Sequence, residues 1–145
     1  FILKVDPKKR MLFNPEESID FNGNTGPFIQ YTHARICSVL RKAGKTSPAF
    51  DTAAVRLEKK EREVVATLYR FHEVLAEASA AYSPALLANY VYELAKAYNQ
   101  FYHEHPILDA AKPEISAFRL SLSSAAASVI KRSMELLGIE VPEKM

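Results

Sequence analysis

A chain of 145 residues with 48% hydrophobic and 25% charged residues can bury an ordinary core, which excludes intrinsic disorder and collagen-like structure. Only 4 glycines accompany many Ala, Leu, Glu and Lys residues, so an all-α fold in one piece is expected. The formal net charge of +2 is too small to indicate a nucleic-acid partner by itself.

Cys37 is the only cysteine, which excludes an internal disulfide and favours a reducing compartment. No apolar run reaches the ~20 residues that span a bilayer, and the N-terminus lacks a signal-peptide pattern. We therefore expect a cytoplasmic protein without a membrane partner.

The first 25 residues are expected to form a short extended connector. FILKV is β-prone, Asp6-Pro7 predicts a turn, and a polar loop begins at Asn14. Because nothing precedes this strand-like run to pair with it, we expect a piece excised from the C-terminal part of a longer protein. The helical domain would then comprise residues 26–145.

A loop that leads into a helix follows, in the run FNGNTGPFIQYTHAR from Phe21 to Arg35. Gly23 and Gly26 permit positive φ, and Pro27 suits the first turn of a helix. We expect this helix to run from Pro27 to about Ala43, with Gly44 after it and a loop over Lys45–Phe50. Its buried stripe should contain Ile29, Ile36, Leu40 and Ala43, flanked by His33 and Val39.

The segment from about Thr52 to Tyr82 has no Gly or Pro and predicts one long helix, or two helices with a break. Its charged stretch EKKERE, from Glu58 to Glu63, alternates in sign. We expect a solvated face there, without a function.

Two further helices should complete the fold. One begins at Pro84 and ends before Pro106, and the other runs from about Ile115 to Leu137. Gly138 then suits a left-handed C-terminal position, followed by Ile139 in a Schellman motif. Four to five helices with short connections predict an antiparallel helical bundle.

Standard catalytic patterns are absent from the sequence: it has no Walker loop, no GxSxG, no HExxH and no CxxC. His103 and His105 lie two residues apart on a helix, so their side chains diverge and a solvated helix end is expected rather than a metal site. We predict no catalytic residue and no metal site.

One face of the first long helix mixes aromatic and cationic groups. Tyr31, Arg35, Ser38 and Lys42 fall at i, i+4, i+7 and i+11, opposite the buried stripe. An unstacked RNA base can pack on a tyrosine while a guanidinium bonds a phosphate or a base edge. Spacing equally allows Tyr31 to be a packing residue and Arg35 a solubilising one.

Basic residues are concentrated toward the front of the chain, because no acidic residue lies between Asp20 and Asp51. A face that contacts phosphates needs such a bias. The basic residues in question are Lys4, Lys8, Lys9, Arg10, Arg35, Arg41, Lys42 and Lys45.

Two residues at the far end of the chain have an open role. Tyr102 lies one step around its helix from the buried stripe, where a phenol can reach an apolar pocket and a polar ligand. If Pro142 folds the tail back, the flexible thioether of Met145 can line a shallow pocket. Spacing does not decide whether RNA, a helix or water is the neighbour of Tyr102.

Three segments, GNTGPFIQYTHAR, NYVYELAKAYNQFYHEHP and LLGIEVPEKM, resemble segments of arginyl-tRNA synthetases, a class I family, in that family's order. The literal Asp-Ala-Leu-Arg string that names this anticodon-binding (DALR) domain class does not occur. A similar last-helix pattern is present in Arg119, Leu120, Leu122 and Ala125.

The resemblance implies that the helical domain binds the anticodon stem and loop of tRNA(Arg). Tyr31, Arg35, Tyr102 and Met145 match positions that contribute to a pocket for an anticodon base, with the central cytosine as the expected one. Arg41 and Lys42 are then candidate phosphate contacts.

The same resemblance implies a separate Rossmann-type catalytic domain in the parent chain, where ATP and magnesium serve the charging of tRNA with arginine. The class I signature motifs for ATP are absent here, so no cofactor is expected in this piece, which should be inactive by itself. The expected partners are tRNA(Arg) and the catalytic domain of the same chain. The alternative from another class is a helical protein–protein interaction module that docks through FILKV and the aromatic surface.

Overall fold

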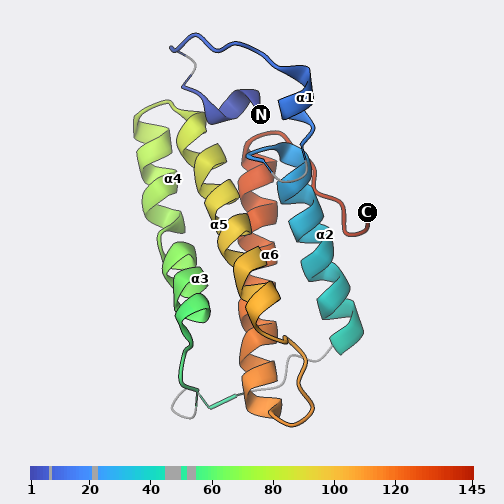
Figure 1. Ribbon diagram of the computed structural model, residues 1–145. Helices are drawn as coiled ribbons and strands as arrows, with labels where there is room; N and C mark the ends of the chain where they lie inside the picture. The colour runs from blue at the N-terminus through green and yellow to red at the C-terminus, as the bar shows by residue number, and fades with distance from the viewer. Residues whose placement is uncertain (7, 21–22, 45–49, 52–54) are drawn as a thin grey trace.

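The computed structural model describes residues 1–6, 8–20, 23–44, 50–51 and 55–145. Within these ranges the chain is all-helical, as expected, with no strand and with five longer helices packed together (Figure 1). The elements are η1 (Ile2–Lys4), α1 (Pro15–Ser18), α2 (Gly26–Ala43), α3 (Lys59–Tyr69), α4 (Phe71–Ala80), α5 (Pro84–Glu104) and α6 (Pro113–Leu136). None of the helices in the described ranges is both long enough and apolar enough to cross a membrane.

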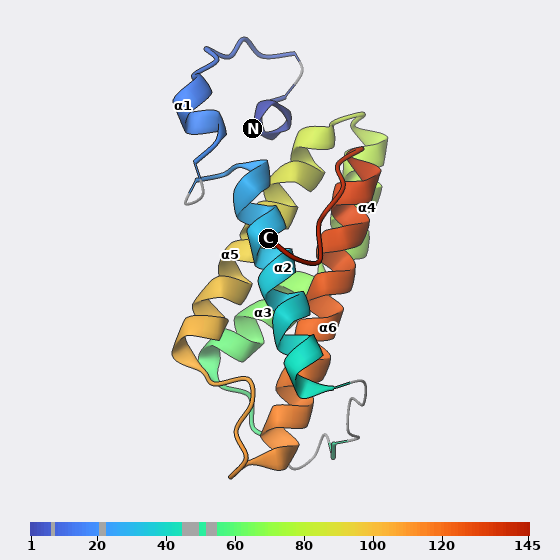
Figure 2. The ribbon, with the colours of Figure 1, turned by 90° about the vertical axis from the view of Figure 1, so that its right-hand side faces the viewer.

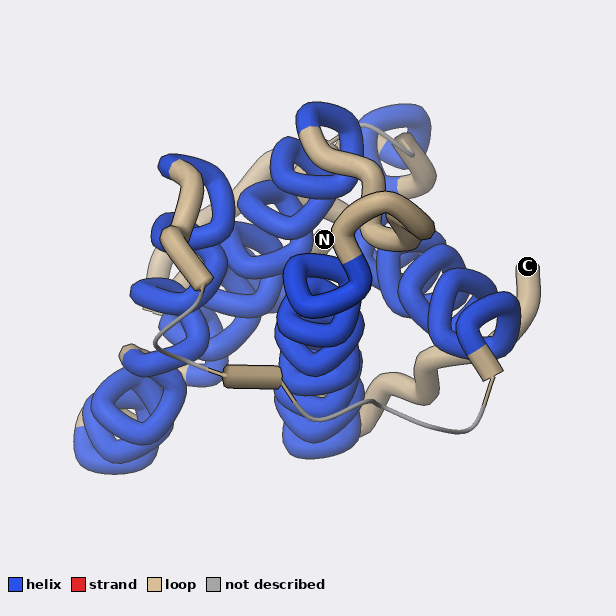
Figure 3. The backbone as a smooth tube through the Cα atoms, turned by 90° about the horizontal axis from the view of Figure 1, so that it is seen from below, coloured by secondary structure: helices blue, strands red, loops and turns tan. Residues whose placement is uncertain are grey.

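Helix α5 is the centre of the bundle, because it packs against η1, α2, α3, α4 and α6. Helices α2 and α5 run in one direction, whereas α3, α4 and α6 run in the opposite direction (Figure 1). A view along the bundle shows the helices end-on, with loops at the near end (Figure 3). The parallel pair α2 and α5 thus places the C-terminal halves of both helices side by side.

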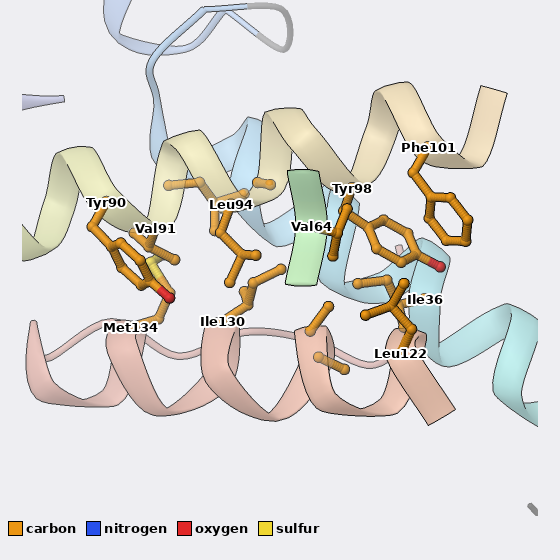
Figure 4. Close-up of a cluster of buried hydrophobic side chains, with 14 of the residues drawn as sticks. Ile36, Val64, Tyr90, Val91, Leu94, Tyr98, Phe101, Leu122, Ile130 and Met134 are labelled. Atoms are coloured by element: carbon orange, nitrogen blue, oxygen red, sulfur yellow. The ribbon is translucent and has the colours of Figure 1, made fainter. Parts of the chain in front are cut away.

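The core lies between α5 and its neighbours (Figure 4). Full burial of a large apolar side chain contributes about 1.5–3 kcal/mol relative to leaving it exposed. The labelled members are Tyr90, Val91, Leu94, Tyr98 and Phe101 of α5, Leu122, Ile130 and Met134 of α6, Ile36 of α2 and Val64 of α3.

Helix α2 begins close to the expected residue, and a threonine caps it. The Thr25 hydroxyl accepts a hydrogen bond from the Phe28 amide at 3.4 Å and itself donates to the Asp20 carbonyl. Neither Gly23 nor Gly26 adopts positive φ: Gly26 is the first helical residue, so the loop does not use the freedom expected of these glycines.

Two other glycines end helices as expected. Gly44 follows α2 with φ 84°, and Gly138 follows α6 with φ 74°. At the second site the Ile139 amide donates to the Met134 carbonyl at 2.9 Å and the Gly138 amide to the Glu135 carbonyl at 3.0 Å. This pair of bonds confirms the Schellman motif.

The first residues do not form the strand-like start that was expected, although the described residues between η1 and α1 are non-helical. FILKV makes a 3₁₀ turn instead, in which the Lys4 amide donates to the Phe1 carbonyl at 3.2 Å. A strand needs a partner for its backbone groups, whereas a helical turn pairs them locally. The loop expected from Asn14 is the capped helix α1, and Pro7 of the expected turn lies outside the described residues.

The long helical segment is two helices, which break at Arg70. Its helical part begins at Lys59 rather than near Thr52; residues 55–58 are not helical, and residues 52–54, like the expected loop at 45–49, lie outside the described residues. The prediction that the EKKERE stretch is solvated throughout is wrong for Glu61, which is 1% exposed. Its carboxylate lies 2.7 Å from Nε of Arg119, in a buried ion pair.

Candidate nucleic-acid interface

A surface hollow of about 450 Å³ lies among α2, α5 and the segment that follows α6. Tyr31, Arg35, Tyr102 and Met145 all line it, so the structure brings together the four residues that the resemblance assigned to a base pocket. The remaining lining residues are Ala34, Ser38, Val39, Arg41, Lys42 and Lys144.

Helix α2 supplies most of this lining, because its 3.6-residue repeat turns one face to the core and another to the hollow. Ile29 and Ile36 are buried in the core, as predicted. Tyr31 remains 44% exposed, so part of its ring is free to contact a ligand.

Arg35 is held between the two tyrosines. Its guanidinium carbon lies 4.8 Å from the ring centre of Tyr31 and 5.2 Å from that of Tyr102, which are distances of cation–π contact. Its Nη1 also donates to Oδ1 of Asn99 at 2.6 Å, and Nδ2 of Asn99 donates to the Thr32 hydroxyl at 2.7 Å. The guanidinium is therefore oriented before any ligand arrives, with further N–H donors left for one.

Asn99 is a site residue that the sequence reasoning missed. It lies on α5 three residues before Tyr102, which puts it one turn away on a neighbouring strip of the same helix. The spacing of three residues from Tyr102, which the sequence had already marked as a candidate, is the signal that points to Asn99.

Tyr102 is half-buried and rests on the core. Its ring stacks on Tyr98 with centroids 6.5 Å apart and planes at 26°. The Tyr98 hydroxyl donates to the Ser123 hydroxyl at 2.9 Å, and burial raises the pKa of Tyr98 to about 12. The neutral ring of Tyr98, held by its hydrogen bond to Ser123, thus supports the ring of Tyr102 from the core side.

The segment around Pro142 folds back along α2, so that the chain returns from the end of α6 to the middle of α2 (Figure 2). Three α2 side chains hydrogen-bond to its backbone carbonyls. Met145 is thereby placed at the hollow, where it remains 63% exposed. Lys144 reaches the same hollow and is a second residue that sequence reasoning missed, although its position beside Met145 was a signal.

Positive charge surrounds this hollow. Arg35, Arg41, Lys42 and Lys144 are among its lining residues, and none of the described residues that line it is acidic. Such a rim attracts the phosphates of a nucleic acid.

The other basic residues at the front of the chain lie elsewhere. Lys8, Lys9 and Arg10 are exposed in the N-terminal segment, at the end of the bundle where α2 and α5 begin (Figure 1). Lys4 places its ammonium 3.9 Å from the ring centre of Phe1, and Lys45 lies outside the described residues. The basic bias of the sequence is thus divided between two ends of the molecule.

A larger hollow of about 640 Å³ lies between α5 and the α3–α4 pair. It mixes the carboxylates of Glu63, Glu77 and Glu93 with the cations of Arg70 and Lys96. A lining of mixed charge lacks the uniform positive potential that a phosphate backbone selects. Size alone therefore does not identify the interface.

His103 and His105 do not gather with other ligands. The ring of His105 packs 5.9 Å from that of Phe101, and the ring of His103 meets that of Tyr102 edge-on. In the part of the chain that the structure describes, no group of three or more His, Cys, Asp or Glu side chains is arranged to hold a metal ion.

Residues 29–145 match the family model described as the DALR anticodon binding domain. Curated relatives include the arginine–tRNA ligases of Parabacteroides distasonis, 55% identical, and Phocaeicola vulgatus, 52% identical. Both comparisons cover 100% of this chain, but only 25% and 24% of the relatives. The chain thus spans about a quarter of the length of the relatives it matches.

Solved structures give the same result. The arginyl-tRNA synthetase of Thermus thermophilus matches 98% of this chain with a TM-score of 0.88 and 36% identity, over 25% of its own chain. That of Plasmodium falciparum matches 99% of this chain with a TM-score of 0.84 and 28% identity, also over 25% of its own chain. In both, the similarity is confined to a quarter of a longer polypeptide.

Proposed function

Because the chain belongs to the DALR anticodon-binding domain family of arginine–tRNA ligases, we propose that it binds the anticodon stem–loop of tRNA(Arg). One observation carries the proposal: Tyr31, Arg35, Tyr102 and Met145 line a single hollow with a positive rim. An unstacked anticodon base, for which we propose the central cytosine, would pack against the exposed tyrosine surface and Met145. Arg35 would donate hydrogen bonds to its edge or to its phosphate.

The rim gives the proposed phosphate contacts. Arg41 and Lys42 follow the base pocket along α2, and Lys42 also lines an adjoining hollow of about 310 Å³ that shares Tyr102 with the first. A cation between two adjacent depressions suits the phosphate that links two nucleotides. Each such contact adds to the salt dependence of binding.

We propose that the parent protein is a cytoplasmic arginine–tRNA ligase and that residues 1–25 connect this domain to its catalytic domain. ATP and magnesium would supply activation of arginine in that domain. The loop before α2 does not fit ATP phosphates: the Thr25 side chain occupies the helix N-terminus, and a Cβ at Gly23 would meet a carboxylate oxygen of Asp20 at 3.3 Å. This chain alone would then be inactive as an enzyme.

Titration of the chain with an anticodon stem–loop of tRNA(Arg) tests the proposal. Tyr102→Ala should weaken binding by about 5- to 150-fold, because stacking of a base on a tyrosine contributes ~1–3 kcal/mol. Tyr69→Ala is the matched control, since Tyr69 lies at the end of α3 and is 88% exposed outside the hollow. Equal affinity of both variants for RNA would remove Tyr102 from the interface.

Base specificity is tested with a second loop in which the central cytosine is replaced by uracil. Indistinguishable affinities of the wild-type chain for the two loops would remove the base-specific claim. Binding should also weaken steeply as salt rises, and Lys42→Ala should reduce the logarithmic salt slope by about 0.7.

The alternative, a helical protein–protein interaction module, rests on the exposure of Ile2, Leu12 and Phe13 near the N-terminus. We propose that these side chains face the catalytic domain of the parent chain. An interaction module would show no preference between the two RNA loops and little salt dependence.

A further inference from the structure

The segment after α6 is held to α2 by three side chains, which we call the tail latch: Gln30, His33 and Arg41. Nε2 of Gln30 donates to the Glu140 carbonyl at 2.8 Å, Nδ1 of His33 lies 2.9 Å from the Pro142 carbonyl, and Nη1 of Arg41 donates to the Glu143 carbonyl at 2.9 Å. The three residues are separated by three and eight positions, which return to the same side of a helix. The latch therefore lies along one side of α2, beside which the segment after α6 runs (Figure 2).

His33 differs from the other two members because it is 3% exposed. A carbonyl oxygen only accepts, so the hydrogen of this bond is on Nδ1. Sγ of Cys37 also lies 3.8 Å from both ring nitrogens, and burial raises the pKa of its thiol. The buried imidazole thus contacts both a neutral thiol and the tail, whereas the long side chains of Gln30 and Arg41 lie nearer the solvent.

The position of Pro142 limits where Met145 can lie. Three residues of extended chain reach about 10 Å, so a held Pro142 keeps Met145 near the hollow. If all three bonds of the tail latch were absent and the tail were fixed only at Gly138, seven residues would let Met145 range over about 24 Å. The latch therefore restricts Met145 to a small volume, and the bond from His33 to the Pro142 carbonyl is its buried member.

We propose that His33 is a positioning residue of the base pocket: its Nδ1–H holds the Pro142 carbonyl and so places Met145 and Lys144 over the hollow. This inference rests on the proposed function, because it names what makes the pocket selective. His33 touches no RNA and acts through the tail.

Two substitutions of similar polarity separate positioning from simple packing. The amide nitrogen of His33→Asn comes close to the place of Nδ1, whereas that of His33→Gln comes closer to the place of Nε2. The first variant should keep the bond to Pro142 and the second should lose it. Cooperative thermal unfolding of both is the check that each folds.

The position of Met145 is read by NMR of the chain labelled with ¹³C at the methionine methyl groups, of which there are three. In His33→Gln the Met145 signal should move toward the value of an unstructured peptide, and in His33→Asn it should stay. Affinity for the central-cytosine loop should fall about 5-fold in His33→Gln, with most of the discrimination against the uracil loop lost.

A double-substitution cycle shows whether His33 acts through the tail. In a background that carries both Lys144→Ala and Met145→Ala, His33→Gln should cause no further loss of affinity, because both side chains that it positions are already gone. Additive losses would show that His33 affects RNA by another route and would overturn the inference.

Other results would overturn it as well. An unchanged Met145 signal in His33→Gln would disprove the latch, and a released tail with unchanged affinity and discrimination would disprove its role in the pocket. Loss in both His33 variants would mark His33 as a packing residue only. If the wild-type chain does not distinguish the loops, the base-specific part of the proposed function fails; a methyl shift confined to His33→Gln would then show a latch that serves no base pocket.

Discussion

Removal of the Glu61 carboxylate should destabilise the bundle strongly. Glu61 and Arg119 have side chains 1% and 9% exposed, and their Oε1 and Nε atoms lie 2.7 Å apart. Arg119 also donates from Nη1 to the Pro106 carbonyl at 2.8 Å, and Oε2 of Glu61 accepts from the Glu58 amide at 2.7 Å. Glu61→Ala leaves a buried guanidinium unpaired and the first turn of α3 without its reciprocal cap.

The expected loss follows from these contacts. Breaking a buried ion pair by removing one partner costs about 3–5 kcal/mol. Urea denaturation followed by far-UV circular dichroism should therefore show a free energy of unfolding lower by about 4 kcal/mol, and a melting temperature lower by roughly 10 °C or more. The substitution should also affect the hollow, because Arg119 bonds to the Pro106 carbonyl in the loop that follows α5, the helix that carries Tyr102.

A matched control lies on the same helix. Glu63 pairs with Lys60 at 2.8 Å, but this pair is at the surface, so Glu63→Ala should leave the free energy of unfolding nearly unchanged. A double variant with Glu61→Leu and Arg119→Met should recover most of the loss, since apolar groups of similar volume can replace a buried pair. A loss below about 1 kcal/mol in Glu61→Ala would refute the argument.

Two further predictions concern the core and a helix end. Burial raises the pKa of Tyr90 and of Tyr98 to about 12. Because the native state holds these protons more tightly than the unfolded chain, the stability from both phenols is full below about pH 10 and declines as pH rises toward 12. In an ultraviolet titration Tyr90 and Tyr98 should ionise last among the seven tyrosines. In Tyr98→Phe only Tyr90 should remain as a tyrosine that ionises late. Simultaneous ionisation of all seven tyrosines would contradict this prediction. In urea denaturation, Gly138→Ala should lower the free energy of unfolding by roughly 1–2 kcal/mol, because the φ of 74° at this position is unfavourable for a residue with a Cβ. The added Cβ would meet no atom within 4 Å, so a steric clash does not contribute. An unchanged free energy of unfolding would show that the turn relaxes.

Local signals were sufficient for most of the helices. Pro84 and Pro106 bracket α5, and Gly138 marks the end of α6, because the conformational limits of these residues do not depend on distant contacts. The same reasoning placed Tyr31 and Arg35 on one face of α2. Their position follows from the helical repeat alone.

The features that sequence reasoning missed depend on contacts between distant residues. Glu61 belongs to an alternating charged stretch that is typical of a solvated helix, and only Arg119, 58 residues later, makes its burial tolerable. The bond of His33 to the Pro142 carbonyl spans 109 residues, and the bond of Arg35 to Asn99 spans 64. No pattern within one helix contains either partner.

The walls of the hollow therefore differ in how firmly they are fixed. Helices α2 and α5 are joined beside it by the chain of bonds through Arg35, Asn99 and Thr32, and both helices continue into the core. The third wall is the tail, which is attached through side-chain contacts to backbone carbonyls and leaves Met145 exposed. A substitution of a residue of the first two walls that packs on the core, such as Tyr102, should change stability and the proposed binding together, because it disturbs the core that supports them. A substitution that frees only the tail should change the proposed fit of a base with little effect on the bundle, so we expect the proposed base selectivity and the stability to be separable in this fold.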